Sequence, residues 1–165
     1  MVAKKICLLG SFAVGKTSLV ARYVRSIYSD EYHTTVGVKV DKKIVEVGEK
    51  KVKLMIWDIA GKDDFFTPPG SYFKGLGGFL LVIDGTRLAT VKVAEELLER
   101  VTEVNGKIPC FLMLNKCDLQ NEWEVEEEHL KVFADQGIPM FKTSAKTGEL
   151  VEDVFTGLAT KMVAD

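Results

Sequence analysis

Long apolar runs are missing from this sequence of 165 residues. None approaches the roughly 20 residues that a helix needs to cross a bilayer, and no charged and then apolar leader suggests secretion. A basic surplus is missing too, because 22 Lys and Arg residues stand against 24 Asp and Glu residues, for a net charge of -2. A general nucleic-acid binder would show the opposite balance. We therefore expect a cytoplasmic protein that binds no nucleic acid.

Cysteine and histidine are also scarce. Cys7, Cys110 and Cys117 lie far apart and are odd in number. They indicate reduced, partly buried thiols rather than metal ligands or a disulfide framework. The two histidines, His33 and His129, lack the spacing of metal ligands and are interpreted as polar surface or loop residues.

Short apolar runs alternate with segments of helical periodicity along the chain. Strands are expected at 4–10, 38–47, 51–58, 77–85, 109–115 and 139–144, and helices at 15–27, 91–104, 125–136 and 150–163. This alternation predicts an α/β fold with a six-stranded, mostly parallel sheet, one antiparallel strand and helices on both faces. No repeat or linker divides the chain, so we expect one domain over residues 1–165.

The stretch "GSFAVGKTSL", residues 10–19, matches the phosphate-loop pattern between a predicted strand and a predicted helix. Its glycines allow backbone N–H groups to surround phosphate oxygens, and the start of the helix adds partial positive charge. The alternative is a glycine-rich turn with a chance lysine, and the motif alone does not separate ATP from GTP. The residues expected at the phosphates are Gly10, Ala13, Val14, Gly15, Lys16, Thr17 and Ser18.

A second motif, "NKCDL", follows a buried strand and points to guanine. Guanine presents two donors on one edge, and the ionised carboxylate of Asp118 accepts both, whereas it would repel the acceptor of adenine. The later stretch "TSAK" supplies a main-chain amide, that of Ala145, for the base oxygen. A polar turn at a strand end is the alternative for the first motif alone. The residues expected at the base are Asn115, Lys116, Asp118, Leu119, Ser144, Ala145 and Lys146.

Two further stretches suggest a magnesium site and a γ-phosphate sensor. In "WDIAG", Asp58 is expected to hold Mg²⁺ through water and the amide of Gly61 to contact the γ-phosphate; a cap of a helix or turn is the alternative for Asp58. In "YHTTVGV", Thr35 is expected to join Thr17 as a hydroxyl ligand of Mg²⁺, with Thr34 as the other candidate.

Two tyrosines accompany these motifs. Tyr28 is expected to cover the edge of the base and Tyr32 the phosphates, with surface or core aromatics as the alternative.

The motifs "GSFAVGKT", "TTVG", "WDIAG", "NKCD" and "TSAK" stand in this order within residues 4–163. In this the chain resembles the small GTPases of the Ras superfamily, nearest the Rab type. The resemblance implies a three-layer P-loop fold (the small G domain), a GTP/GDP switch, and slow hydrolysis involving Lys16, Thr35 and Gly61. It also implies that GTP orders residues 28–38 (the first switch) and 59–74 (the second switch), which then bind a protein effector. An exchange factor, a GTPase activator and a monomeric state are expected with it.

The chain departs from the family at two positions near the γ-phosphate. Lys62 stands where members that hydrolyse GTP usually have glutamine, so Asp63 or Asp64 is an alternative group to orient the attacking water. Phe12 stands where a small residue is usual, and its ring is expected to hinder an arginine finger. A GTP-binding scaffold with negligible hydrolysis, controlled by exchange, therefore stays an alternative function, while Asp118 argues against an ATP-using enzyme.

Two features near the second switch and the chain end complete the expectations. Pro68 and Pro69 predict a short or irregular helix in the second switch. The ending "KMVAD" carries no cysteine box for prenylation and no polybasic tail. It predicts a switch without a lipid anchor, which would also suit a bacterial or archaeal member, or a protein whose tail has been removed.

Overall fold

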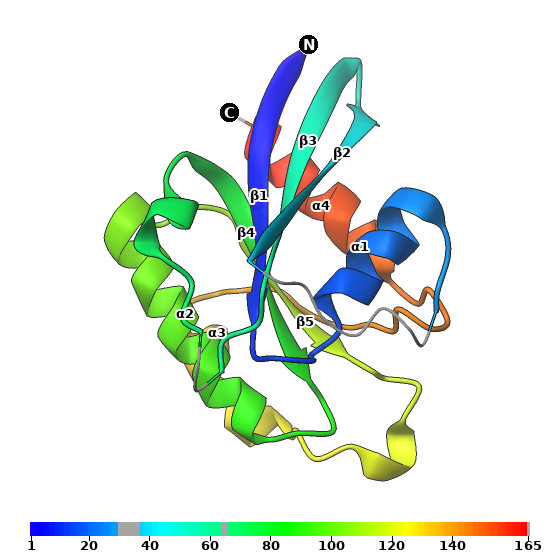
Figure 1. Cartoon of the computed structure of the whole chain (residues 1–165), viewed down its shortest axis with the longest axis vertical. Coiled ribbons are helices and arrows are strands. Elements are labelled where there is room, and N and C mark those ends of the chain that lie inside the picture. Colours follow the sequence, from blue (N-terminus) through cyan, green and yellow to red (C-terminus); the bar gives the residue numbers. More distant parts are fainter. Residues whose placement is uncertain (30–36, 64–65, 165) are drawn as a thin grey trace.

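A computed structural model of the chain describes residues 1–29, 37–63 and 66–164. Its centre is a six-stranded sheet in the order β2-β3-β1-β4-β5-β6 (Figure 1). The strands are β1 (Val2–Gly10), β2 (Val38–Val47), β3 (Lys50–Ile59), β4 (Leu76–Asp84), β5 (Cys110–Asn115) and β6 (Met140–Lys142). Only β2 and β3 pair in antiparallel fashion, and every other pair is parallel. The predicted fold class is confirmed.

Helices cover both faces of this sheet (Figure 1). They are α1 (Lys16–Arg25), α2 (Ala89–Asn105), α3 (Lys131–Asp135) and α4 (Val151–Val163), with 3₁₀ turns η1 (Gly70–Phe73), η2 (Gln120–Glu122) and η3 (Glu127–Leu130). α1 and α4 lie on one side, and α2 and α3 on the other. No helix in the described part of the chain is long and apolar enough to cross a membrane.

Each face of the sheet has its own hydrophobic core, because successive side chains of a strand point to opposite faces. From β1, Ile6 and Leu8 pack beneath α1 and α4, while Cys7 and Leu9 pack beneath α2. The strands next to the phosphate loop are thereby held from both sides, so their carboxyl ends form a rigid edge for a site.

The predicted helix over 125–136 is wrong in its extent. The structure has the 3₁₀ turn η3 followed by the five-residue α3. Glu126 stays extended and forms a reciprocal cap with His129, whose Nδ1 accepts the Glu126 main-chain N–H at 2.9 Å. This local capping replaces the longer amphipathic helix that the spacing of apolar residues predicted. The short helix expected after the proline pair is confirmed, since η1 is the helical element described between β3 and β4.

All three cysteines are buried free thiols, as expected. Burial raises the pKa of Cys7 to about 12, against a smaller lowering effect of the Lys5 charge, and raises the pKa of Cys110 further.

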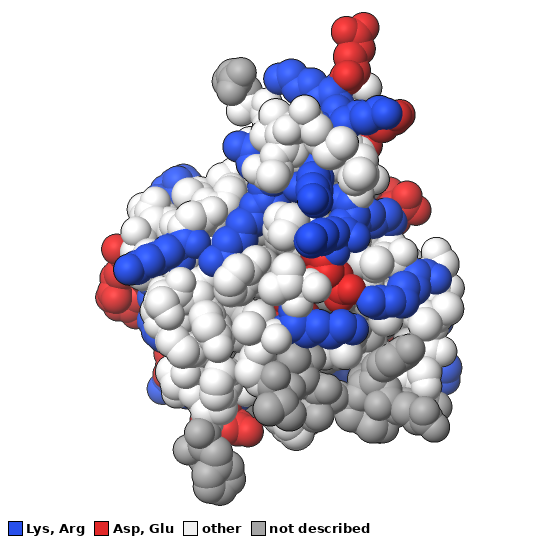
Figure 2. All heavy atoms as spheres, turned by 45° about the horizontal axis from the view of Figure 1, so that its top comes forward, with Lys and Arg blue, Asp and Glu red and all other residues white. Residues whose placement is uncertain are grey.

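Charge is unevenly distributed over the surface despite the small net value. Figure 2 shows Lys and Arg side chains gathered where β1 begins and the hairpin of β2 and β3 projects. The hairpin strands contribute the runs "KVDKK" and "KKVK". This face lies at the end of the sheet opposite the phosphate loop.

Candidate functional site

The phosphate loop connects the carboxyl end of β1 to α1, and packing requires both of its motif glycines. A Cβ on Gly10 would lie 2.5 Å from the Val82 carbonyl oxygen, and one on Gly15 would lie 2.4 Å from Asn115 Nδ2. Gly15 also has a φ of 100° and Ala13 a φ of 61°, in the left-handed region. A non-glycine residue is rare in that region and marks a loop held in place by its surroundings.

Lys16 lies within the curl of this loop. Its ammonium group is buried and donates to the carbonyl oxygens of Ser11 at 3.1 Å and Gly10 at 3.5 Å. Burial lowers the pKa of Lys16 to about 8, the Asp58 charge opposes this shift, and the Arg87 charge adds to it. A poorly solvated cation at the start of a helix is a strong partner for a phosphate.

Thr17 and Asp58 meet beside the loop, although they are 41 residues apart in the chain. The Thr17 hydroxyl donates to Asp58 Oδ2 at 2.8 Å, and Asp58 is buried at the end of β3. No cluster of three or more His, Cys, Asp or Glu side chains suited to a metal occurs in the described residues. A hydroxyl and one carboxylate fit Mg²⁺, which binds few protein ligands and completes its shell with phosphate and water. Thr35 and Thr34 lie outside the described residues.

A cavity of about 290 Å³ extends from the phosphate loop and collects most of the residues predicted at the base. Gly15, Ser18, Tyr28, Asn115, Lys116, Asp118, Leu119, Ala145 and Lys146 line it. At its rim the Ser144 hydroxyl donates to Asp118 Oδ1 at 2.8 Å, which fixes the direction of the carboxylate. Tyr32 lies outside the described residues.

Asn115 and Lys116 link this cavity to the phosphate loop. Asn115 Nδ2 donates to the Val14 carbonyl at 2.9 Å, and Lys116 Nζ donates to the Ala13 carbonyl at 3.2 Å. Lys116 has a φ of 70°, so both residues of its contact have a left-handed backbone. The base and phosphate ends of the site therefore form one hydrogen-bonded unit.

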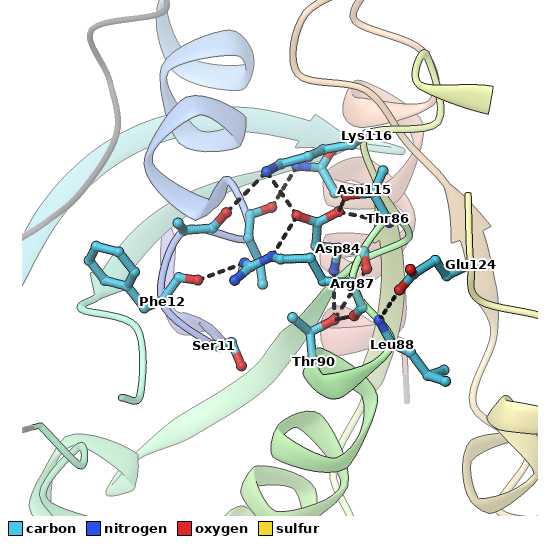
Figure 3. Close-up of polar contacts among 12 residues, drawn as sticks. Ser11, Phe12, Asp84, Thr86, Arg87, Leu88, Thr90, Asn115, Lys116 and Glu124 are labelled. Carbon is cyan, nitrogen blue, oxygen red and sulfur yellow. Dashed lines mark hydrogen bonds and ion pairs between the residues drawn. The ribbon is translucent and has the colours of Figure 1, made fainter. Parts of the chain in front are cut away.

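Three residues near the site escaped the sequence reasoning. Arg22 of α1 donates to the main-chain carbonyls of Ala145 and Lys146 and so holds the "SAK" loop. Asp84 ends β4 and contacts Lys116, and Arg87 follows β4 and contacts the phosphate loop (Figure 3). The sequence could have indicated Asp84 and Arg87, because charged residues at the carboxyl end of a buried parallel strand lie at the ligand-binding edge of such a sheet.

The start of the second switch lies directly against the phosphate loop. The Phe12 N–H donates to the Lys62 carbonyl at 3.1 Å, and the Lys62 N–H donates to the Gly10 carbonyl at 3.0 Å. A Cβ on Gly61 would lie 2.4 Å from Phe12 Cα, so only glycine fits. Asp63 Oδ1 accepts the Phe66 N–H at 2.8 Å and thus belongs to a local turn, while Asp64 lies outside the described residues.

The end of the second switch is fixed to the rest of the protein by three side-chain donors, Lys5 from β1 and Arg100 and Asn105 from α2. Lys5 Nζ donates to the carbonyls of Tyr72 and Lys74, Arg100 to that of Pro68, and Asn105 to that of Phe73, at 2.6 to 2.9 Å. Such multiple anchoring restricts the range 68–74.

A larger cavity of about 760 Å³ lies at the other ends of the strands and is lined by residues such as Leu98, Cys110 and Ile138. None of the predicted site residues lines it, so size alone is a poor guide to the site here.

Comparison with known proteins agrees with this geometry. The model of the family described as "Ras family" matches residues 5–164. Ras-related protein RABD2c of Arabidopsis thaliana is 36% identical over 156 residues, which cover 93% of this chain and 77% of that protein. Ras-related protein Rab-13 of Canis lupus familiaris is 32% identical, covering 94% and 77% of the two chains. The GTP-binding protein YPT1 of Saccharomyces cerevisiae is 35% identical, covering 96% and 78%.

Proposed function

The chain belongs to the Ras family as a small GTP-binding protein that switches between GTP and GDP states, and from this premise we propose which of its residues perform each part. It is a GTPase that uses Mg²⁺ and interacts with effectors, exchange factors and GTPase activators, as this family does. The proposal concerns the binding residues, the rate of hydrolysis and the surface that responds to the nucleotide.

We assign the phosphates to the loop that encloses Lys16 and the guanine base to the cavity that Asp118 lines. The observation that carries this assignment is the link between them, in which Asn115 and Lys116 donate to consecutive carbonyls of the phosphate loop. Asp118, whose Oδ1 accepts from Ser144, can accept both donors of guanine with its remaining lone pairs. The proposed contact residues are Gly10, Ala13, Val14, Gly15, Lys16, Thr17, Ser18, Tyr28, Thr35, Gly61, Asn115, Lys116, Asp118, Leu119, Ser144, Ala145 and Lys146.

For the metal, we propose Thr17 as a direct ligand and Asp58 as a ligand through water, with Thr35 joining them in the GTP state. The 2.8 Å hydrogen bond between Thr17 and Asp58 supports the first two assignments, because it brings both oxygens to one point beside Lys16. Mg²⁺ at this point supplies charge neutralisation for the outer phosphates.

Hydrolysis is proposed to be slow. Lysine offers only N–H donors, whereas the glutamine amide usual at this position both accepts from the water and donates toward the transferring group. A Lys62 contact to the γ-phosphate would exist in the ground state as well, so it tightens binding without lowering the barrier. The hydrogen bond of Asp63 to the Phe66 N–H supports a structural role for Asp63 instead of a catalytic one.

The nucleotide-dependent surface is proposed to lie on residues 28–38 and 59–74, where Thr35 and Gly61 would sense the γ-phosphate and the anchored residues 68–74 would respond least. One chain supplies every proposed binding residue, so a monomer suffices. The three buried thiols are consistent with a reducing compartment such as the cytoplasm.

The site assignment is tested by calorimetric titration of GDP and ADP. GDP is expected to bind at least ~10³-fold more tightly, because the wrong base leaves buried polar groups unpaired. Asp118→Asn is expected to weaken GDP binding and to favour the xanthine nucleotide, whose 2-carbonyl accepts from the new amide. Comparable affinities for GDP and ADP in the wild type would refute the assignment.

A further inference from the structure

Three consecutive carbonyl groups of the phosphate loop each accept a hydrogen bond from a side chain outside the loop. Asn115 donates to the carbonyl of Val14, and Lys116 donates to that of Ala13, as described above. The third carbonyl, that of Phe12, accepts from Arg87 Nη2 at 2.7 Å (Figure 3). Arg87 comes from the loop after β4, 75 residues away in sequence.

The direction of these carbonyls determines the direction of the loop's donors. In a tight loop, a carbonyl turned outward places a neighbouring N–H on the inner side, where phosphate oxygens are bound. The left-handed Ala13, with a φ of 61°, is strained without such support. Donors on the outer side therefore stabilise the conformation that binds phosphate.

Asp84 organises two of the three donors. Its Oδ2 lies 3.0 Å from Arg87 Nε and 2.8 Å from Lys116 Nζ, and its Oδ1 accepts the Thr86 N–H and hydroxyl at 2.9 and 2.7 Å. Burial alone would raise the pKa of Asp84, but the hydrogen bonds and charge of Lys116 and the hydrogen bonds of Thr86 outweigh burial and lower it. The carboxylate thus stays ionised between two cations.

We propose that Arg87, oriented by Asp84, is a positioning residue that holds the outer side of the phosphate loop at Phe12 and thereby slows the release of guanosine diphosphate. The proposal rests on the proposed function, because it needs a nucleotide in this loop. Arg87 contacts the loop at the Phe12 carbonyl, so its effect is on the geometry of the inward N–H donors of Ala13, Val14 and Gly15.

The guanidinium group suits this task for a geometric reason. Its nitrogens project in fixed directions, so Nε bonds Asp84 while Nη2 bonds the Phe12 carbonyl. A lysine ammonium is a single point and cannot span both acceptors equally well. The Arg87 side chain is 43% exposed, so the ion pair by itself contributes little; what matters is that it directs the second hydrogen bond at the loop.

The test is the release rate of fluorescent GDP and GMP from the full chain in the presence of Mg²⁺. Arg87→Ala is expected to speed GDP release about five- to tenfold, the loss typical of one intramolecular hydrogen bond at a half-exposed site. GMP release should change less than twofold, because GMP lacks the outer phosphate that the loop encloses. Arg87→Lys should give an intermediate GDP rate.

Arg25→Ala is the matched control. Arg25 also pairs with an aspartate, Asp41, at 2.7 Å and its side chain is 41% exposed, but it lies away from the loop. Its GDP release should equal that of the wild type. The ³¹P resonance of the GDP β-phosphate should shift in Arg87→Ala and stay in place in Arg25→Ala, which a general loss of stability would not produce.

The outcomes separate this proposal from the proposed function. If the wild type prefers GDP to ADP but Arg87→Ala releases GDP at the wild-type rate, the positioning role is wrong and the function stands. Equal acceleration of GDP and GMP release would also overturn it, since the effect would then not pass through the phosphate loop. A wild type that does not prefer GDP to ADP would contradict both the positioning role of Arg87 and the proposed function.

Discussion

Phe12 and Lys62, the two residues that we expect beside the γ-phosphate, are hydrogen-bonded to each other through their main chains. The Phe12 N–H donates to the Lys62 carbonyl at 3.1 Å, and the neighbouring bond from the Lys62 N–H to Gly10 completes a short parallel pairing. These two bonds attach the main chain at Lys62 to the phosphate loop.

The first prediction concerns hydrolysis at this point. Single-turnover hydrolysis of GTP should proceed on the order of 10⁻⁴ s⁻¹ or more slowly, the intrinsic level of such proteins. Lys62→Gln should raise the rate, because the amide both accepts from the water and donates. Phosphate release after mixing with Mg²⁺ measures both.

Asp63→Ala is the control for that experiment. The Asp63 carboxylate holds the Phe66 N–H, so its loss should leave the rate unchanged. A wild-type rate well above the stated level, insensitive to Lys62→Gln and lost in Asp63→Ala or Asp64→Ala, would show that a carboxylate orients the water.

The second prediction locates the nucleotide response within the second switch. With a non-hydrolysable GTP analogue in place of GDP, amide hydrogen exchange should slow in 28–38 and 59–67. It should change little in 68–74, because Lys5, Arg100 and Asn105 fix that range through its carbonyls in a manner independent of the nucleotide.

Arg100→Ala should extend the response into 68–74, and Thr35→Ala should abolish it in 28–38 while GDP affinity is kept. Equal protection of both segments by both nucleotides would contradict the switch mechanism.

The third prediction concerns the metal. Removal of Mg²⁺ by EDTA should speed GDP release from the wild type, because the charge of the outer phosphates is then balanced by Lys16 alone. Thr17→Ala should show fast release already with Mg²⁺ and little further effect of EDTA, whereas Thr17→Ser keeps the hydroxyl and should behave as the wild type. If EDTA does not change the rate of GDP release from the wild type, this would argue against a metal at the Thr17–Asp58 pair.

The fourth prediction is a pH dependence of stability. The pKa of Asp84 is lower in the folded protein than the ordinary value of about 3.9. Its contribution is therefore fully present above that ordinary value and is lost as the pH falls through the folded pKa. Asp84→Asn should reduce the free energy of unfolding by about 2 kcal/mol at pH 7, and the difference should shrink below about pH 4. A difference that is constant down to pH 3 in urea denaturation would contradict this account.

The fifth prediction tests the packing of Gly85 against the Trp123 ring. A Cβ on Gly85 would lie 2.0 Å from the Trp123 ring, so Gly85→Ala should destabilise the protein by about 1–3 kcal/mol. Gly70→Ala is the control, because a Cβ there meets nothing within 4 Å. Combining Gly85→Ala with Trp123→Leu should cost less than the sum of the two single changes, since the ring causes the clash.

Much of this protein follows from short-range patterns in its sequence. Alternation of apolar strands with amphipathic helices determines the layered α/β fold, because each element must bury its apolar side. The phosphate loop and the residues around Asp118 are equally local, since phosphates need glycines beside a helix start and guanine needs an acceptor pair. These motifs could be read without coordinates because each one contains its own chemistry.

Tertiary structure alone decided how distant segments support those motifs. Arg87 and Arg22 donate to main-chain carbonyls, and Asp84 orients Arg87 for its bond. Every residue has a carbonyl, so only the folded structure reveals which side chain reaches which one. The short α3 was likewise decided by the cap between Glu126 and His129 rather than by apolar periodicity. The pairing of Lys62 with Phe12 depends on β3 continuing beside β1, a register that only the assembled sheet establishes.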